Sequence, residues 1–187
     1  MKYRLILVFI IMTQYSKAQQ SSNHWSDHLY FEGLYTDLRS THSTHFRGAA
    51  VEIGKEISPL FSLGGGLEYS GCPYHDDNGY DLYNVNFVPV YVNEKLKFIK
   101  TGKIIPLLDF SEGIPFTSYR QELINDPASA KQVHESGLYV FAGMGLLWNI
   151  SKKISLLADT GIKSYNVTFN NLDVNPHGLS GKIGLVF

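Results

Sequence analysis

The chain has 187 residues, the length of a single domain, and a formal net charge of −1, so no basic stripe is available for a nucleic-acid partner. Its 12 Tyr, 11 Phe and 17 Gly favour many strands with close backbone contacts. The single cysteine, Cys72, excludes an intramolecular disulfide. We expect a free surface thiol there, since no activating base lies beside it in the sequence.

The first residues have the pattern of an export signal. A positively charged start, the apolar run LILVFIIM and the small-residue cleavage site SKA follow one another. The apolar run is far shorter than the roughly 20 residues that a membrane-spanning helix needs. We therefore predict a cleaved signal peptide over residues 1–18, a short segment over 19–27 and one barrel domain over 28–187.

After the signal, apolar and polar residues alternate strictly over stretches of about ten positions. In GAAVEIGKE, for instance, Ala49, Val51 and Ile53 share one face and Glu52 lies on the other. Eight such segments follow, at residues 28–38, 47–57, 61–71, 83–97, 103–118, 137–150, 153–168 and 178–187. Short turns (SPL, FIKTG, SKK) alternate with longer polar connections, of which residues 119–136 are the longest, as in an up-and-down meander.

The apolar faces indicate which side of the sheet is outside. They are almost free of charge over a height close to that of a hydrocarbon slab, whereas the opposite faces mix charges with glycine, which suits a narrow, filled lumen. Aromatic residues near segment ends are typical of interfacial girdles; they are Tyr35, Tyr69, Tyr83, Phe98, Tyr119, Tyr139, Trp148 and Tyr165. These patterns predict an all-β, eight-stranded antiparallel up-and-down transmembrane β-barrel.

Three runs of the sequence carry a family resemblance. VEIGKEISPLFSLGGGLEYS, NFVPVYVNEKLKF and FAGMGLLWNISKKISLLADTGIKSY resemble the small outer-membrane β-barrel family that includes PorT-like proteins and the OmpA-like transmembrane domain. Gly-rich alternating strands, tight periplasmic turns and prolines within central strands, here Pro89 and Pro106, are typical of that family. The resemblance implies integral localisation in a bacterial outer membrane, and no catalytic motif comes with it.

Alternation also predicts which charged side chains point into the barrel: Glu32, Glu52, Glu68, Glu94, Asp109, Asp159, Lys163 and Lys182. Charges in a narrow lumen must pair, so we expect a structural polar network, with a proton or ion path as the alternative. The acids outnumber the bases, so either Arg39, Arg47 or Arg120 reaches in from the rim or some carboxylates are protonated. Glu112 has the parity of Phe110 on the lipid face, and a bulge at SEG would return it inward.

Other candidate chemistry lies in the connections. THSTH (41–45) and YHDD (74–77) contain residue types that suit a metal at the rim, although solvated loop residues are the ordinary explanation. HST (42–44), with Asp37 or Asp76 nearby, is the nearest approach to the Ser-His-acid site of a lipid-modifying barrel. Because these residues lie in loops, we assign no catalytic, cofactor-binding or metal-ligating residue, and no cofactor.

The chain ends on the patterned run GLSGKIGLVF, in which Leu179, Ile183, Leu185 and Phe187 share a face. This run predicts a closing strand that pairs with the first strand near HLYFEGLY, and Phe187 resembles the signal read by the barrel-assembly machinery. We expect a monomer with a structural or surface-interaction function through long extracellular loops. Its expected partners are outer-membrane lipid, the assembly machinery and an unidentified extracellular or periplasmic protein. The alternatives are an enzyme that acts on outer-leaflet lipid and a soluble exported barrel that binds an apolar ligand in a lumen of Val and Leu.

Overall fold

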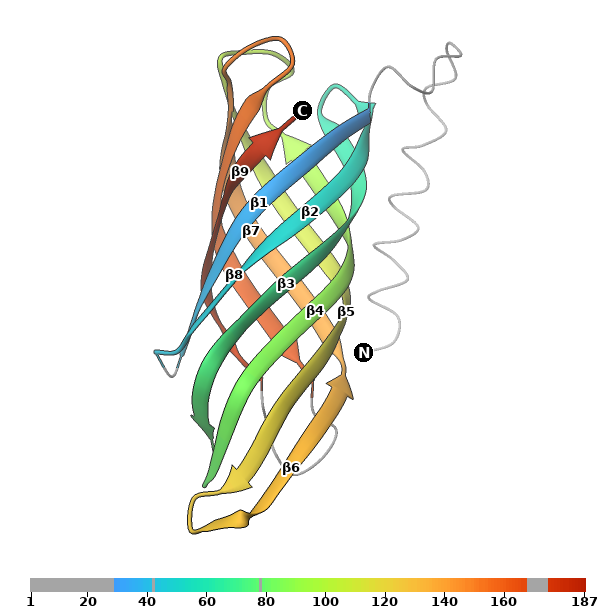
Figure 1. Cartoon of the computed structure of the whole chain (residues 1–187). Coiled ribbons are helices and arrows are strands. Elements are labelled where there is room, and N and C mark those ends of the chain that lie inside the picture. Colours follow the sequence, from blue (N-terminus) through green and yellow to red (C-terminus); the bar gives the residue numbers. More distant parts are fainter. Residues whose placement is uncertain (1–28, 42, 78, 168–174) are drawn as a thin grey trace, which may run out of the picture.

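The computed structural model describes residues 29–41, 43–77, 79–167 and 175–187. The strands of this described part are β1 (Leu29–Ser40), β2 (His45–Ser58), β3 (Phe61–Asp77), β4 (Tyr80–Lys97), β5 (Ile104–Leu123), β6 (Asp126–Ser136), β7 (Leu138–Asn149), β8 (Ser155–Asn166) and β9 (His177–Val186). They form one antiparallel sheet, which closes into a barrel because β1 pairs with β9 and β4 with β5 (Figure 1). The predicted signal peptide and the segment 19–27 lie outside the described residues.

Eight strands form the closed wall, as predicted, and β6 extends it. β5 pairs with β7 over Ile104–Gly113 and with β6 over Phe116–Leu123, so β6 continues the line of β7. Gly137 separates the two strands at a point where an added Cβ would lie 1.8 Å from the carbonyl oxygen of Asn166. Only glycine fits such a close approach.

The prediction of a long loop over residues 119–136 is wrong, because most of that segment is the β5–β6 hairpin. The connection CPYHDDNGYDL is likewise mostly strand, since β3 runs to Asp77 and β4 begins at Tyr80. The wall is therefore taller on the β3–β6 side than on the β8–β9–β1 side (Figure 1). We name this end of the barrel the loop end, and the opposite end, which carries the connections 59–60, 98–103 and 150–154, the turn end.

Exposure alternates along the strands with the predicted parity. In β8, Thr160 and Ile162 are exposed while Asp159 and Lys163 are buried, and in β9 Lys182 is buried. The exposed side chains form an apolar belt that includes Phe31, Val51, Ile53, Leu67, Val90, Val92, Leu108, Phe110, Ile114, Leu146, Ile162, Leu179, Ile183 and Leu185. The soluble alternative required the apolar faces to point into the lumen, and they point outward. No helix among the described residues is long and apolar enough to cross a bilayer.

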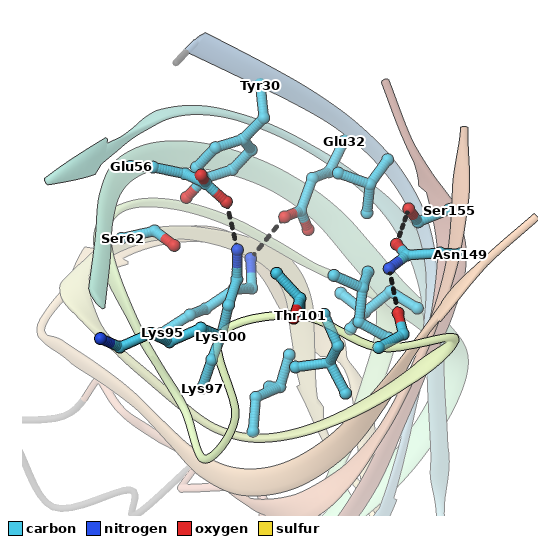
Figure 2. A pocket seen from close by; sticks show the side chains of 16 residues that line it. Tyr30, Glu32, Glu56, Ser62, Lys95, Lys97, Lys100, Thr101, Asn149 and Ser155 are labelled. Atoms are coloured by element: carbon cyan, nitrogen blue, oxygen red, sulfur yellow. Dashed lines mark hydrogen bonds and ion pairs between the residues drawn. The ribbon is translucent and has the colours of Figure 1, made fainter. Parts of the chain in front are cut away.

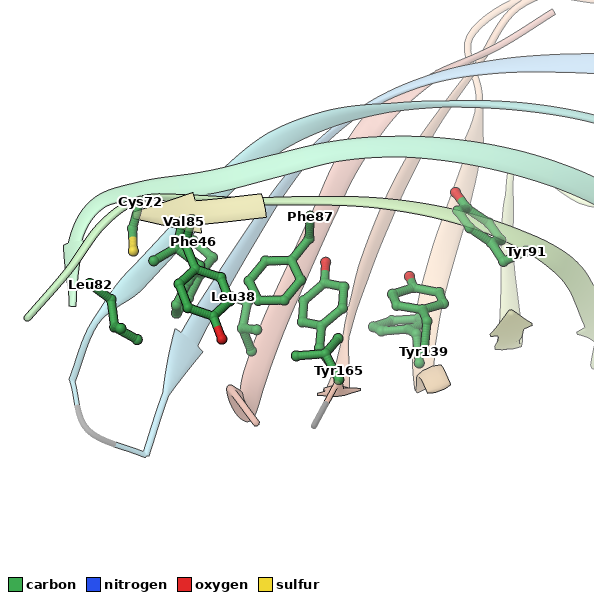
Figure 3. Packing of buried hydrophobic residues seen from close by; sticks show 12 residues of the cluster. Leu38, Phe46, Cys72, Leu82, Val85, Phe87, Tyr91, Tyr139 and Tyr165 are labelled. Atoms are coloured by element: carbon green, nitrogen blue, oxygen red, sulfur yellow. The ribbon is translucent and has the colours of Figure 1, made fainter. Parts of the chain in front are cut away.

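The loop half of the interior is an aromatic core (Figure 3). The rings of Phe87 and Tyr165 stack with centroids 4.3 Å apart, and the Tyr139 ring lies 5.3 Å from that of Tyr165. The girdle prediction is wrong for Tyr119, Tyr139 and Tyr165, because each has the inward parity of its strand and is buried here. Cys72 is buried in the same core and is not a surface thiol.

Other aromatic residues predicted for the girdle do face outward. Tyr35, Tyr69, Phe98 and Trp148 are exposed. Tyr35 and Tyr69 alternate with buried neighbours, Trp148 has the outward parity of β7, and Phe98 directly follows β4 at the turn end. An outward aromatic ring has an apolar body and, in Tyr and Trp, a polar tip, so it is suited to a membrane interface. These four side chains are therefore exposed, as the girdle prediction requires.

Candidate functional site

The polar network inside the barrel is centred on three lysines. The first, Lys163 of β8, donates from Nζ to both carboxylate oxygens of Glu68 on β3, at 2.9 and 3.0 Å. The hydroxyls of Tyr165 and Thr36 also donate to Glu68 Oε1, at 2.8 and 3.2 Å. All four side chains are buried. Because β3 and β8 lie on opposite sides of the eight-stranded ring, this cluster ties facing walls together.

The second lysine, Lys95 of β4, is absent from the predicted set. Its Nζ donates to Glu32 Oε1 on β1 at 2.8 Å and to Glu52 Oε2 on β2 at 2.7 Å. Tyr91 completes the group by donating its hydroxyl to Glu52 Oε1 at 2.9 Å. Lys95 thus supplies the cation that the predicted list of six acids and two bases lacked.

The third lysine, Lys182 of β9, lies near Glu52, which also belongs to the group around Lys95. Lys182 Nζ lies 3.2 Å from Asp109 Oδ2, 3.9 Å from Glu52 Oε1 and 3.8 Å above the centroid of the Phe141 ring. Asp159 is its cross-strand neighbour on β8 and is also buried. These contacts stabilise charges that would otherwise be costly to bury.

The structure buries seven of the eight predicted lumen residues, Glu32, Glu52, Glu68, Asp109, Asp159, Lys163 and Lys182. The prediction for Glu94 is wrong. Side chains alternate along β4, so Glu94 and Lys95 cannot both point inward, and Glu94 shares the outer face with Val92 and Leu96. Because Val92 and Leu96 mark the outer face of β4, the sequence itself indicates that Lys95 points inward.

The structure also decides two points about charged residues that the sequence left open. Glu112 is exposed on the outer face, as its parity predicts, and the bulge that would return it inward is not formed, since the register between Val92–Glu112 and Glu94–Phe110 is continuous. The rim arginines stay outside. Arg39 and Arg47 are exposed, and Arg120 pairs with Glu122 at 2.9 Å.

A cavity of about 460 Å³ opens at the turn end of the lumen (Figure 2). Charged side chains line one side, where Lys97 pairs with Glu56 and the buried Glu32–Lys95 pair borders the interior. Leu107, Leu157 and other apolar residues line the rest. None of the aromatic core residues lines this cavity, so it is a vestibule at one mouth rather than a passage.

The rim residues considered for metal binding or catalysis have separate partners. His45 Nδ1 lies 3.1 Å from Asp37 Oδ1, whereas His75 Nδ1 lies 3.1 Å from the hydroxyl of Thr44. Among the residues that the structure describes, no three His, Cys, Asp or Glu side chains are grouped to hold a metal ion. His42, a member of the Ser-His-acid alternative, lies outside the described residues.

The last residue closes the seam between the first and last strands, as the pairing of GLSGKIGLVF with HLYFEGLY predicts. Phe187 N–H donates to the carbonyl of Phe31 at 2.9 Å, and Phe31 N–H donates back at 3.1 Å. Their rings lie 6.5 Å apart, and the Phe187 side chain is exposed on the outer face. Its role as an assembly signal stays a prediction.

No family model and no curated protein matches the chain. The fold is similar to that of a major outer membrane protein from Thermus thermophilus, with a TM-score of 0.61 and 12% identity over 85% of this chain and 98% of that one. It is also similar to Ail, the attachment invasion locus protein of Yersinia pestis (TM-score 0.52, 10% identity, 86% and 97% covered). Neisserial surface protein A has a TM-score of 0.51 at 9% identity, with 85% and 93% covered.

At these identities the likeness is one of fold. It agrees with the closed wall of eight antiparallel strands and with the apolar belt around that wall. An exposed apolar surface of this kind is stable against lipid, and a closed barrel leaves no unpaired strand edge in the bilayer. The chain therefore has the fold of the small outer-membrane β-barrels, and its closed wall and apolar belt suit a barrel that spans a lipid bilayer.

Proposed function

We propose that the protein is a monomeric outer-membrane barrel, closed to solutes, that presents the tall β3–β6 side of its wall as a contact surface outside the cell. The observation that carries this proposal is that these strands stay paired beyond the apolar belt, up to Asp77–Tyr80 and Leu123–Asp126. We name the part of the wall formed by residues 71–77, 80–86, 117–123 and 126–136 the projecting sheet.

The outer face of the projecting sheet has the chemistry of a binding surface. Tyr74 donates its hydroxyl to Asp81 at 2.6 Å, and its ring lies 5.5 Å from that of Tyr83. The guanidinium of Arg120 lies 5.8 Å from the centroid of the Tyr83 ring and pairs with Glu122. Tyr and Arg are enriched among the residues that dominate binding energy, and here they are held by strands rather than by loops.

The filled lumen argues against transport. The aromatic core occupies the loop half, and the lysine-centred network crosses the rest. A narrow eight-stranded barrel has room for such side chains and little else. A structural or contact role therefore fits better than a channel.

The proposed orientation rests on how far the wall extends past the apolar belt. Barrels of this type are short on the periplasmic side and longer on the extracellular side, which would place the turn end in the periplasm and the projecting sheet outside. Ail, which shares the fold, is named for attachment and invasion, so a contact role is compatible with this architecture. Membership of the PorT-like or OmpA-like group is a finer prediction that rests on the sequence runs alone, and the absence of enzymatic activity stays an expectation. Lipid and the assembly machinery remain the expected partners.

Thiol labelling in intact cells tests the orientation. Ala130→Cys places an exposed thiol on β6, and the matched Lys152→Cys places one in a turn-end connection. Because Cys72 is buried, it contributes little background. A membrane-impermeant maleimide should label Ala130→Cys in intact cells and Lys152→Cys only after the outer membrane is opened. The reverse pattern would overturn the proposal.

A shortened hairpin tests the contact role. Replacing residues 122–130 by Asn-Gly keeps the Gln121–Lys131 pair and closes the strands with a type I′ turn, and Tyr74→Thr, Tyr83→Thr and Arg120→Thr in the same variant remove the Tyr and Arg side chains of the outer face. We expect this variant to reach the membrane in wild-type amounts, while cells that carry it attach to solid surfaces and sediment differently from wild-type cells. Identical attachment and sedimentation at equal barrel levels would contradict a contact role for the projecting sheet.

A further inference from the structure

Two carboxylates point out of the barrel into the apolar belt. They are Glu94 on β4, flanked by outward Val92 and Leu96, and Glu112 on β5, flanked by outward Phe110 and Ile114. The register pairs Val92 with Glu112 and Glu94 with Phe110, so the carboxylates are diagonal neighbours on adjacent strands. They are close enough to repel each other. We name them the outer acidic pair.

No cationic side chain of the described residues pairs with the outer acidic pair. Neither carboxylate has a hydrogen bond or ion pair to a described residue. The outward lysine in the same register row, Lys55 on β2, is separated from Glu94 by Leu63 on β3. That separation is two strand spacings, roughly 10 Å. Ionisable groups in hydrocarbon are costly and mark functional positions, so these two call for an external partner.

A shallow, open hollow lies on the neighbouring strands of the same outer face. Its lining includes the small residues Ala142 and Thr160, with Met144, Ile162 and Leu179 around them. Ala142 pairs with Phe110, which in turn pairs with Glu94, so the hollow and the acidic pair form one continuous surface over β4, β5, β7 and β8. Small residues at such a surface let another backbone approach closely.

We infer that this surface is a lateral docking site within the membrane for a protein segment that carries an arginine or lysine side chain. A carboxylate in hydrocarbon either takes up a proton or pairs with a cation, and attraction between opposite charges is stronger in the low dielectric of the bilayer than in water. The hollow on the neighbouring strands gives the segment room to lie against the wall. A symmetric contact with a second copy would bring four carboxylates together, so a second copy is a poor occupant. The inference is independent of the projecting sheet and extends the proposed function.

The test uses a synthetic probe. The barrel, labelled with a donor dye at Ala130→Cys, is reconstituted into phosphatidylcholine vesicles with an acceptor-labelled poly-leucine transmembrane peptide that has one central Arg. Matched peptides have a central Gln or Glu. Energy transfer should report association with the Arg peptide that is about tenfold tighter than with the Gln peptide, the effect of one strong polar contact between membrane segments.

Two variants locate the effect. Glu94→Gln/Glu112→Gln should lose the preference for the Arg peptide, because the charges are gone while the outer shape is kept. Asp37→Asn is the matched control, since Asp37 is an outward carboxylate that already has His45 as a partner. It should keep the preference. Heat-modifiable migration verifies that both variants are folded.

Four results would overturn the inference. The first is equal association of the wild-type barrel with the Arg and Gln peptides, and the second is an Arg preference that survives in the double variant. The third is self-association of the barrel without peptide, detected as crosslinked dimers that disappear in the double variant, which would assign the surface to a second copy. The fourth is loss of the Arg preference in Asp37→Asn, which would place the effect in general surface charge.

Discussion

The two halves of the lumen are filled by different chemistry. Toward the turn end, Lys95 and Lys182 hold carboxylates from several strands, and the geometry of each contact is specific. Toward the loop end, stacked and tilted rings around Phe87 and Tyr139 fill the same narrow cylinder. Glu68, Lys163 and Tyr165 belong to both halves. A closed barrel can therefore be packed by charges or by rings, but a buried charge depends on every one of its partners, whereas a ring depends mainly on shape.

The largest expected effect is that of Lys163→Met. It removes the cation from buried Glu68, which should destabilise the barrel by about 3–5 kcal/mol, the usual cost of one unpartnered buried charge. Urea unfolding in lipid vesicles measures it. The double variant Glu68→Gln/Lys163→Met removes both charges and should recover most of the loss. If Lys163→Met is as stable as the wild type, a buried charge in this lumen does not depend on its partner, and the two halves do not differ in the way described.

Tyr165→Phe should have the next largest effect on the free energy of unfolding. Tyr165 contacts both the charged and the aromatic half of the lumen. The substitution keeps the stacked ring but removes a hydroxyl that donates to Glu68 at 2.8 Å. Loss of a hydrogen bond to a charged group costs about 1.5–3 kcal/mol. Unfolding under the same conditions measures the change. If Tyr165→Phe is neutral, the ring rather than the hydroxyl is what Tyr165 contributes.

Phe87→Leu tests the tolerance of the aromatic half. The substitution keeps an apolar side chain of similar size and loses the ring stacked on Tyr165, so we expect a loss of about 1–1.5 kcal/mol. The equilibrium unfolding midpoint is again the measurement. A loss as large as that of Lys163→Met would mean that ring geometry is as demanding as charge pairing.

The smallest expected effect is that of Lys97→Met at the vestibule. Lys97 pairs with Glu56, whose side chain is 38% exposed, so water can replace the lost partner. Pairs of this kind contribute about 0–1 kcal/mol. A change in unfolding free energy comparable to that of Lys163→Met would show that the vestibule belongs to the buried network.

The wall was predictable because lipid imposes a pattern on the sequence. One face of each strand meets hydrocarbon, so residues such as Ile162 and Ile183 alternate with buried polar ones and reveal the direction of each side chain. The same rule places Lys95 inside and Glu94 outside, since Val90, Val92 and Leu96 mark the outer face of β4. Those two residues were predictable from alternation applied strictly.

Other features had no such signal. Beyond the belt both faces of a strand can be polar, so β6 has no alternation to distinguish it from a loop. Alternation gives the direction of a side chain but not its height in the barrel, which depends on strand tilt and stagger. Glu68 and Lys163 are 95 residues apart, and their meeting across the lumen depends on that stagger. For the same reason the separation of the interior into charged and aromatic halves could not be predicted.

Planar-bilayer conductance of the purified barrel shows whether charges and rings together close the lumen. The closed lumen predicts no steady current above that of the bare bilayer at any applied voltage that the bilayer withstands. A steady current proportional to voltage, present in the wild-type barrel and abolished when the barrel is unfolded by heat, would contradict it.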